Sequence, residues 1–150
     1  MPHSIAPVYL HTVFSTKYKK HLITPAIEQK LYKQIGGIIH KLRGIPIEIN
    51  GMPDHIHILS TLPRTVTIAK YIEEIKKGSS KWIKTQGPEF QYFAWQGGYA
   101  TFSVSHYKVD TVAGYIKKQK GHHKRKSFEK ELIQYLEENQ IVYDEKYLWD

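Results

Sequence analysis

The stretch "IPIEINGMPDHIHILS", residues 45–60, decides the fold because it holds two strand patterns joined by one turn. Its first six residues, 45–50, place isoleucine at every second position, which is typical of a strand with one buried face. The segment "GMPD" at 51–54 predicts a turn. The segment "HIHILS" at 55–60, rich in β-branched residues, predicts the next strand. The stretch therefore predicts a hairpin.

The segments on both sides of this hairpin predict a complete α+β domain. Periodicity, capping residues and glycine positions predict strands over 6–15 and 99–106 and helices over 24–42, 66–84, 110–120 and 127–139. The resulting order is βαββαβ, which is the ferredoxin-like arrangement of an antiparallel sheet. Such a sheet has helices on one face and leaves the other available for ligands. The helices over about 109–139 form a C-terminal extension.

The length and composition favour one soluble domain spanning residues 1–150. Hydrophobic residues make up 41% of the chain and charged residues 24%, and no segment has the roughly 18–20 consecutive apolar residues of a membrane span. The N-terminus does not resemble a signal peptide. The chain has no cysteine, which excludes disulfides, thiolate zinc sites and a cysteine nucleophile. A cytoplasmic location is expected.

The charge favours a polyanionic partner, of which nucleic acid is the commonest. The formal net charge is +8, and residues 117–126 contain six Lys/Arg and two His. The alternative interpretation of such a run is a solvated helix end and loop. If the partner is DNA, eight basic side chains are candidates for phosphate contact without sequence readout. They are Lys17, Lys19, Lys20, Lys117, Lys118, Lys124, Arg125 and Lys126.

Two histidines lie on one face of the predicted strand over 55–60. Side chains on a strand alternate, so His55 and His57 point one way while Ile56 and Ile58 point to the helices. Two imidazoles on one face are a suitable start for a divalent metal site. Histidines with this spacing are also common on strands that are merely half-exposed.

Tyr115 and Gln119 are four residues apart on a predicted helix and therefore share a face. The glutamine carbonyl is a candidate third metal ligand, and the tyrosine hydroxyl beside it is a candidate nucleophile. The alternative is that both residues pack and meet solvent. The densest basic run in the chain follows this pair directly.

The two motifs together resemble one known family. "PDHIHIL" at 53–59 resembles the histidine–hydrophobic–histidine motif of the HUH endonuclease superfamily, and "YIKKQ" at 115–119 resembles the catalytic helix of its single-tyrosine, IS200-like transposase branch. Their order and spacing also match, together with "TKYKK" after the first strand and "WQGGYATFSVS" before the tyrosine helix. The resemblance covers nearly the whole chain.

The resemblance implies DNA transposition by cleavage and rejoining of single-stranded DNA with hairpins at the element ends. It implies that His55, His57 and Gln119 hold Mg²⁺ or Mn²⁺, and that Tyr115 attacks the scissile phosphate. The products are a 5′-phosphotyrosine and a free 3′-hydroxyl. The family also implies a homodimer in which the tyrosine of one chain acts in trans at the site of the other. The base that deprotonates the tyrosine is not identified.

Several interpretations stay open. Asp54 either orients a histidine from outside the ligand set or belongs to the turn, and His11, His40 and His106 are expected to have structural roles. The protein is alternatively a non-catalytic nucleic-acid-binding ferredoxin-like module, in which Tyr115 and Gln119 are incidental. A further alternative is a domesticated or relaxase-like nicking enzyme of the same superfamily.

Overall fold

The sheet is antiparallel and has four strands in the order β2-β3-β1-β4, as seen in a computed structural model that describes residues 4–122, 127–144 and 148. This order and the sequence of elements confirm the ferredoxin-like βαββαβ prediction. The elements are β1 (Tyr9–Ser15), η1 (Lys17–Lys19), α1 (Pro25–Lys41), β2 (Pro46–Met52), β3 (His55–Thr61), α2 (Ile68–Ile83), η2 (Pro88–Phe90), β4 (Ala100–Val104), η3 (His106–Lys108), α3 (Val109–Lys117), α4 (Gln119–His122) and α5 (Phe128–Glu138).

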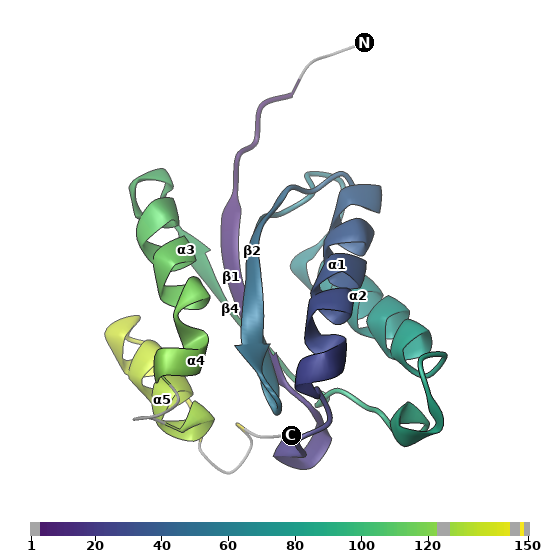
Figure 1. Cartoon of the computed structure of the whole chain (residues 1–150). Helices are drawn as coiled ribbons and strands as arrows, with labels where there is room; N and C mark the ends of the chain where they lie inside the picture. The colour runs from purple at the N-terminus through teal and green to yellow at the C-terminus, as the bar shows by residue number, and fades with distance from the viewer. Residues whose placement is uncertain (1–3, 123–126, 145–147, 149–150) are drawn as a thin grey trace.

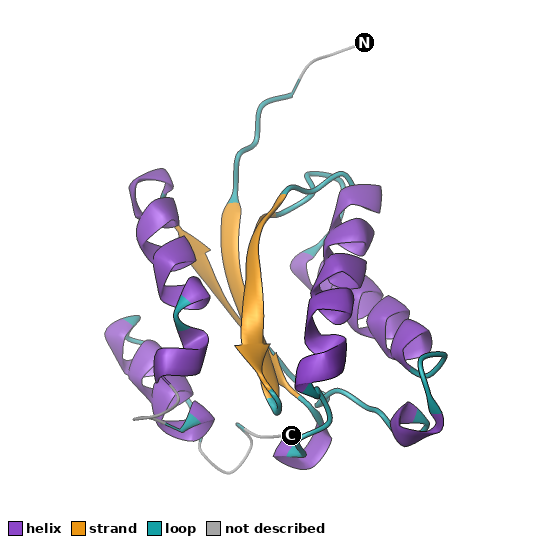
Figure 2. Cartoon of the chain, viewed as in Figure 1, coloured by secondary structure: helices purple, strands orange, loops and turns teal. Residues whose placement is uncertain are grey.

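Helices cover both faces of the sheet. Helices α1 and α2 lie on one side, and α3, α4 and α5 lie on the other, as Figures 1 and 2 show. The C-terminal extension was predicted, but the second face was expected to stay available for ligands, and in this structure the extension covers it. No helix in the described part of the chain is long and apolar enough to span a bilayer.

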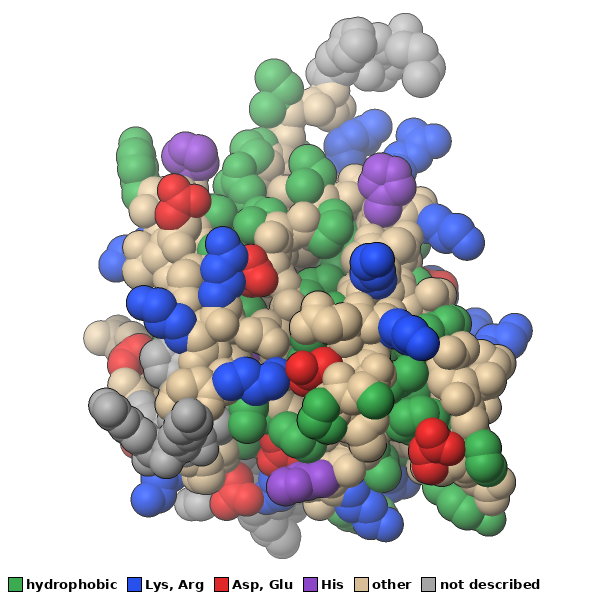
Figure 3. All heavy atoms as spheres, in the orientation of Figure 1, with side chains coloured by type: hydrophobic (Ala, Val, Ile, Leu, Met, Phe, Trp, Pro, Cys, Tyr) green, Lys and Arg blue, Asp and Glu red, His purple; other side chains and the backbone are tan. Residues whose placement is uncertain are grey.

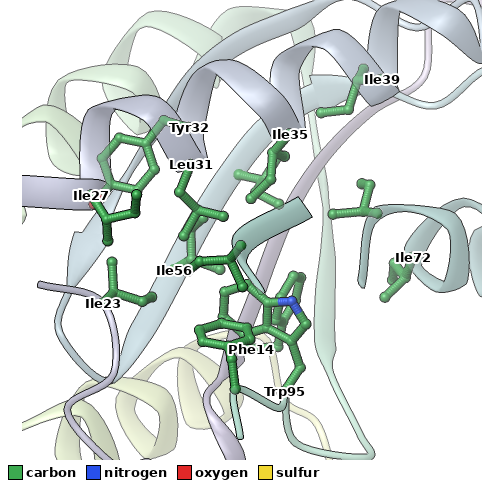
Figure 4. Packing of buried hydrophobic residues seen from close by; sticks show 14 of the residues in the cluster. Phe14, Ile23, Ile27, Leu31, Tyr32, Ile35, Ile39, Ile56, Ile72 and Trp95 are labelled. Atoms are coloured by element: carbon green, nitrogen blue, oxygen red, sulfur yellow. The ribbon is translucent and has the colours of Figure 1, made fainter. Parts of the chain in front are cut away.

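The main core lies between the sheet and the pair α1 and α2 (Figure 4). Strand β3 contributes Ile56 and Ile58, both 0% exposed, as its alternation predicted. Helix α1 presents an apolar stripe toward them that includes Leu31 and Ile35. Because these isoleucines are fixed under the helices, the histidines of β3 must point to the opposite face.

Strand β2 departs from the predicted pattern. The expected strand began at Ile45, but β2 begins at Pro46 and its pairing with β3 shifts register between Pro46 and Glu48. Ile45 precedes the strand and is 63% exposed, whereas Ile49 packs on the core. An irregularity of this kind is common on edge strands, and it breaks the simple alternation of faces.

The predicted helix over 110–120 is divided at Lys118, where the backbone has φ −96° and ψ 16°. The side chain of Asn50 on β2 donates hydrogen bonds to the carbonyls of Ile116 (3.0 Å) and Lys117 (3.3 Å) at this point. These carbonyls stand in the last turn of α3, where the regular i→i−4 donors of the helix end. Asn50 therefore ties the break to the edge of the sheet.

Candidate metal and tyrosine site

His55 and His57 lie fully buried on the sheet face that α3, α4 and α5 cover, each 0% exposed. Their Nδ1 atoms are held by neighbours: His55 Nδ1 lies 2.7 Å from Asp54 Oδ1, and His57 Nδ1 lies 2.8 Å from His11 Nε2. This leaves the two Nε2 atoms to face a common point. Histidines that ligate metals are typically oriented in this way through their second ring nitrogen.

Glu131 of α5 occupies that common point. Its Oε1 lies 2.9 Å from His57 Nε2 and 3.5 Å from His55 Nε2. Its Oε2 accepts hydrogen bonds from the Tyr115 hydroxyl and from Gln119 Nε2, the latter at 3.1 Å. The carboxylate, only 2% exposed, therefore joins the two histidines to the two residues predicted from the tyrosine helix.

The donor atoms fit a divalent metal ion. His55, His57 and Glu131 each offer a ligand atom, all within 4.8 Å of one another, and Gln119 Oε1 lies 3.4 Å from His55 Nε2. Bonds of about 2.1 Å at angles of about 90–110° place neighbouring ligands roughly 3.0–3.4 Å apart. The spacings from Glu131 Oε1 to the two imidazole nitrogens, 2.9 and 3.5 Å, are close to that range, and the widest spacing, at most 4.8 Å, would have to shorten around an ion.

Helix α5 is fixed over the site by an apolar face. Phe128 stacks on the His55 ring, with 4.4 Å between ring centroids and an interplanar angle of 21°. Leu132 and Leu136 pack with Val13 and Phe102 of the sheet in a second hydrophobic cluster. Ser127 caps the helix, since its hydroxyl accepts a hydrogen bond from the Lys130 amide. This packing determines where Glu131 lies.

The break between α3 and α4 places Tyr115 and Gln119 at the same cluster from two short helices. Lys120 anchors α4 to the hairpin and to α1, because its ammonium donates to the Gly51 carbonyl at 2.6 Å and pairs with Glu28 of α1 at 2.9 Å. The Tyr115 ring lies 6.0 Å from the His57 ring of its own chain. The arrangement in this chain is thus a cis arrangement.

The pKa values of the cluster follow from burial and from the Glu131 carboxylate. Burial alone would lower the pKa of His55, but hydrogen bonds to Asp54 and Glu131 outweigh it and raise the pKa above its usual value. Burial, followed by the proximity of His57, lowers the pKa of His11 well below its usual value. Burial and the hydrogen bond to Glu131 raise the pKa of Tyr115 above its usual value, so its hydroxyl keeps its proton here.

The basic residues predicted to contact DNA fall into three groups. Lys17 and Lys20 are exposed on the turn after β1, while Lys19 of the same turn pairs with Glu129 at 2.5 Å. At the end of α3, Lys117 and Lys118 are also exposed. Lys124, Arg125 and Lys126 lie outside the described residues. Figure 3 shows basic side chains spread over the visible face and interspersed with acidic ones.

Two residues of the cluster were not predicted from sequence. Glu131 was missed because its helix reads as an ordinary amphipathic helix with several glutamates. His11 was expected to be structural; it is buried and contacts His57, and the signal in the sequence is its place on the same face of β1 as Val13. His40 and His106, also expected to be structural, are exposed. Asp54 lies in the turn between β2 and β3, and its carboxylate also contacts His55, so the structure shows the geometry of both interpretations.

The fold and the cluster together define a class: a ferredoxin-like domain with a half-buried tyrosine beside a candidate His-His-Glu metal site. The chain belongs to the IS200-like transposase family, since the family model described as "Transposase IS200 like" matches residues 4–119. The match ends at Gln119, so Glu131 and α5 lie beyond it. No match to a curated protein sequence was found.

Solved structures support the same fold. A candidate transposase from Deinococcus radiodurans is 18% identical, with a TM-score of 0.61, and the match covers 79% of this chain and 95% of that one. A REP-associated tyrosine transposase bound to a REP hairpin is also 18% identical, with a TM-score of 0.57 and coverage of 82% and 74%. At this level of identity the likeness concerns the fold.

Proposed function

We propose that this protein is a metal-dependent transposase that cleaves and rejoins single-stranded DNA, with Tyr115 as the nucleophile. The observation that carries the proposal is the meeting of the half-buried Tyr115 with the buried residues His55, His57 and Glu131. Family membership supports the reaction class. A non-catalytic binding module would have no need for a tyrosine hydroxyl beside a candidate metal site.

His55, His57 and Glu131 would hold the metal ion, with Gln119 Oε1 as a further ligand on the side of His55. When bound, a divalent ion acts as a Lewis acid on a phosphate oxygen and stabilises the charge that develops during attack. Asp54 and His11 would keep the two imidazoles turned so that their Nε2 atoms face the ion. We propose Mg²⁺ or Mn²⁺ as the ion.

The proposed reaction is an exchange of one phosphate ester for another. The Tyr115 oxygen attacks the scissile phosphorus, the bond to the 3′-oxygen breaks, and the 5′ phosphate becomes linked to Tyr115 while a 3′-hydroxyl leaves. A 3′-hydroxyl later attacks the same phosphorus and releases Tyr115, so the ester bond is conserved and no nucleotide cofactor is needed. The Tyr115 proton, which points to the Glu131 carboxylate in this structure, is lost as the Tyr115 oxygen attacks, and the departing 3′-oxygen takes up one proton to become the hydroxyl.

The substrate we propose is single-stranded DNA with a hairpin near the cut. A structurally similar protein is bound to a REP hairpin, and this chain has a net charge of +8 that favours a nucleic-acid backbone. Lys17, Lys20 and Lys118 are exposed and available for phosphate contact. Such contacts would fix the register of the DNA without reading its sequence.

We also propose a homodimer in which helices α3 and α4, which carry Tyr115 and Gln119, exchange between the two chains. Exchange requires α3 and α4 to leave the cis position described above, and the division at Lys118 supplies a short joint for that movement. Mixing Tyr115→Phe protein with His55→Ala/His57→Ala protein tests the exchange. Adduct formation by the mixture, with neither protein active alone, supports trans catalysis, and an inactive mixture rejects it.

The polarity of a covalent adduct tests the proposed function. Single-stranded hairpin DNA labelled at its 3′ end should give a protein–DNA band in a denaturing gel with Mn²⁺, while the same DNA labelled at its 5′ end should give only a shortened free fragment. Chelator or the His55→Ala/His57→Ala pair should abolish both products. An adduct carrying the 5′ label, or cleavage that persists in chelator, would contradict the proposal.

A further inference from the structure

The turn that follows β1 has a backbone that its residues do not favour. Tyr18 has φ 60° and ψ 19°, Lys19 has φ 55°, and the amide of Lys20 bonds back to the Lys17 carbonyl at 3.4 Å. Two successive positive φ angles at the centre of a four-residue turn are normally taken by Asn and Gly. A tyrosine in the left-handed region is unusual, and such outliers concentrate at functional sites.

The surrounding chain holds the turn in this conformation. The Thr16 hydroxyl donates to the carbonyls of Lys20 (2.6 Å) and Asp54 (3.2 Å), and the Thr16 amide donates to Asp54 at 2.9 Å. The Lys17 amide donates to the Ala94 carbonyl at 2.8 Å. The left-handed backbone is therefore fixed by hydrogen bonds from both ends of the turn.

The side chain of Tyr18 is not used for packing. Tyr18 is 74% exposed, although it occupies a strained position. The ammonium groups of Lys17 and Lys20 lie 5.5 and 5.9 Å from the centre of its ring. An exposed ring between two cations combines a stacking surface for an unpaired base with contacts for its neighbouring phosphates, which is how single-stranded nucleic acid is commonly bound.

The turn also touches the candidate site from two sides. Through Thr16 it is bonded to Asp54, which in turn holds His55. Through Lys19 it is paired with Glu129, two residues before Glu131 on α5. In Figure 1 the turn, coloured purple, lies at the same end of the sheet as the hairpin between β2 and β3. A strand of DNA that reaches the site would therefore meet Tyr18 nearby.

We propose that Tyr18 is a stacking platform for an unpaired base of single-stranded DNA, with Lys17 and Lys20 on the phosphates beside that base. This inference rests on the proposed function, because it assigns part of the same substrate to a surface beside the tyrosine site. The proposed contact of Tyr18 differs from the phosphate contacts of the lysines. It depends on stacking of the flat Tyr18 ring on a base and not on charge.

Substitution at Tyr18 separates a binding role from a structural one. Tyr18→Asn should relieve the left-handed strain and raise the unfolding midpoint, yet weaken binding of a single-stranded oligonucleotide at least fivefold, because one base loses its stacking partner. Tyr18→Trp should retain wild-type binding. Tyr107→Ala is the matched control, since Tyr107 is 92% exposed and lies beyond β4, at the opposite end of β1, and it should bind as wild type. All binding is measured by fluorescence anisotropy in chelator.

A probe inside the DNA provides the second measurement. Single-stranded DNA carrying 2-aminopurine at successive positions should show quenching at one position with wild type and Tyr18→Trp, and no quenching at that position with Tyr18→Asn. Wild-type affinity and quenching in Tyr18→Asn, or equal losses in Tyr18→Asn and Tyr107→Ala, would overturn the proposal. A wild-type protein that binds no single-stranded DNA would also overturn it.

The two proposals fail in distinguishable ways. If wild type forms no covalent adduct but Tyr18→Asn still loses binding, the transposase chemistry is wrong and the stacking site stands as part of a DNA-binding surface. If the adduct forms and Tyr18→Asn binds as wild type, the chemistry stands and the stacking site is rejected.

Discussion

The Tyr115 hydroxyl donates a hydrogen bond to the carboxylate of Glu131, whose other oxygen lies 2.9 Å from His57 Nε2. One side chain of α5 thus contacts both the candidate nucleophile and a candidate metal ligand. Burial raises the pKa of Tyr115, and this contact with Glu131 raises it further. The contact also links the two groups, because an ion held through Oε1 would share one carboxylate with the Tyr115 hydroxyl on Oε2.

Glu131→Gln should weaken Mn²⁺ binding by about tenfold or more, because the substitution removes a charged oxygen ligand and leaves the two imidazoles. Isothermal titration of the protein with Mn²⁺ measures the affinity. Glu129→Gln is the matched control on the same helix, since its exposed carboxylate pairs with Lys19 and should not affect the ion. Unchanged or tighter binding in Glu131→Gln would remove Glu131 from the ligand set.

Asp54→Asn should destabilise the metal-free protein more at about pH 6 than at about pH 9. Hydrogen bonds to carboxylates raise the pKa of His55 in the folded state, so the linked stability is fully present below the unfolded value near 6.5 and is lost as pH rises through the raised folded value. Asparagine removes the charge that favours the protonated ring. Urea unfolding in chelator at both pH values measures the difference.

His11, in the same cluster, contributes a pH dependence of the opposite sign. The pKa of His11 is lowered, first by burial, so its linked stability is lost as pH falls below about 6.5, which is the opposite direction. That contribution is shared by wild type and Asp54→Asn and cancels in their comparison. An equal loss of stability at both pH values would show that Asp54 acts on the turn alone.

Ile56→Ala should reduce the free energy of unfolding by about 2–5 kcal/mol, because Ile56 is 0% exposed in the main core. Ile45→Ala should change it by less than about 0.5 kcal/mol, because Ile45 lies before β2 and is 63% exposed. Urea denaturation compares the two variants. Equal costs would contradict the face assignment of the hairpin on which the position of His55 and His57 depends.

The fold was largely predictable from sequence because local patterns and tertiary packing agree. Alternation fixed the face of Ile56 and Ile58, and the element order selected one sheet topology. The edge strand was less predictable: the register shift after Pro46 depends on pairing with β3, which no local pattern encodes. The split between α3 and α4 is likewise bonded to Asn50, far away in sequence, so no local pattern marks it.

The candidate site was predictable where its residues form local sequence patterns. His55, His57, Tyr115 and Gln119 carry recognisable spacings, and the structure brings all four together. Glu131 carries no such spacing, and its place in the cluster follows from how Phe128 and its neighbours on α5 pack against the sheet. The role of a residue that tertiary packing brings to a site can be recognised only once the position of its helix is known.

The most direct test of the central claim compares Tyr115→Phe with Tyr135→Phe in the adduct assay with 3′-labelled single-stranded hairpin DNA and Mn²⁺. The two rings lie 5.6 Å apart, and phenylalanine keeps the ring packing in both variants. We predict that Tyr115→Phe forms no adduct while it still binds the DNA, and that Tyr135→Phe forms the adduct. An adduct that persists in Tyr115→Phe, or that disappears only in Tyr135→Phe, would contradict the assignment of Tyr115 as the nucleophile.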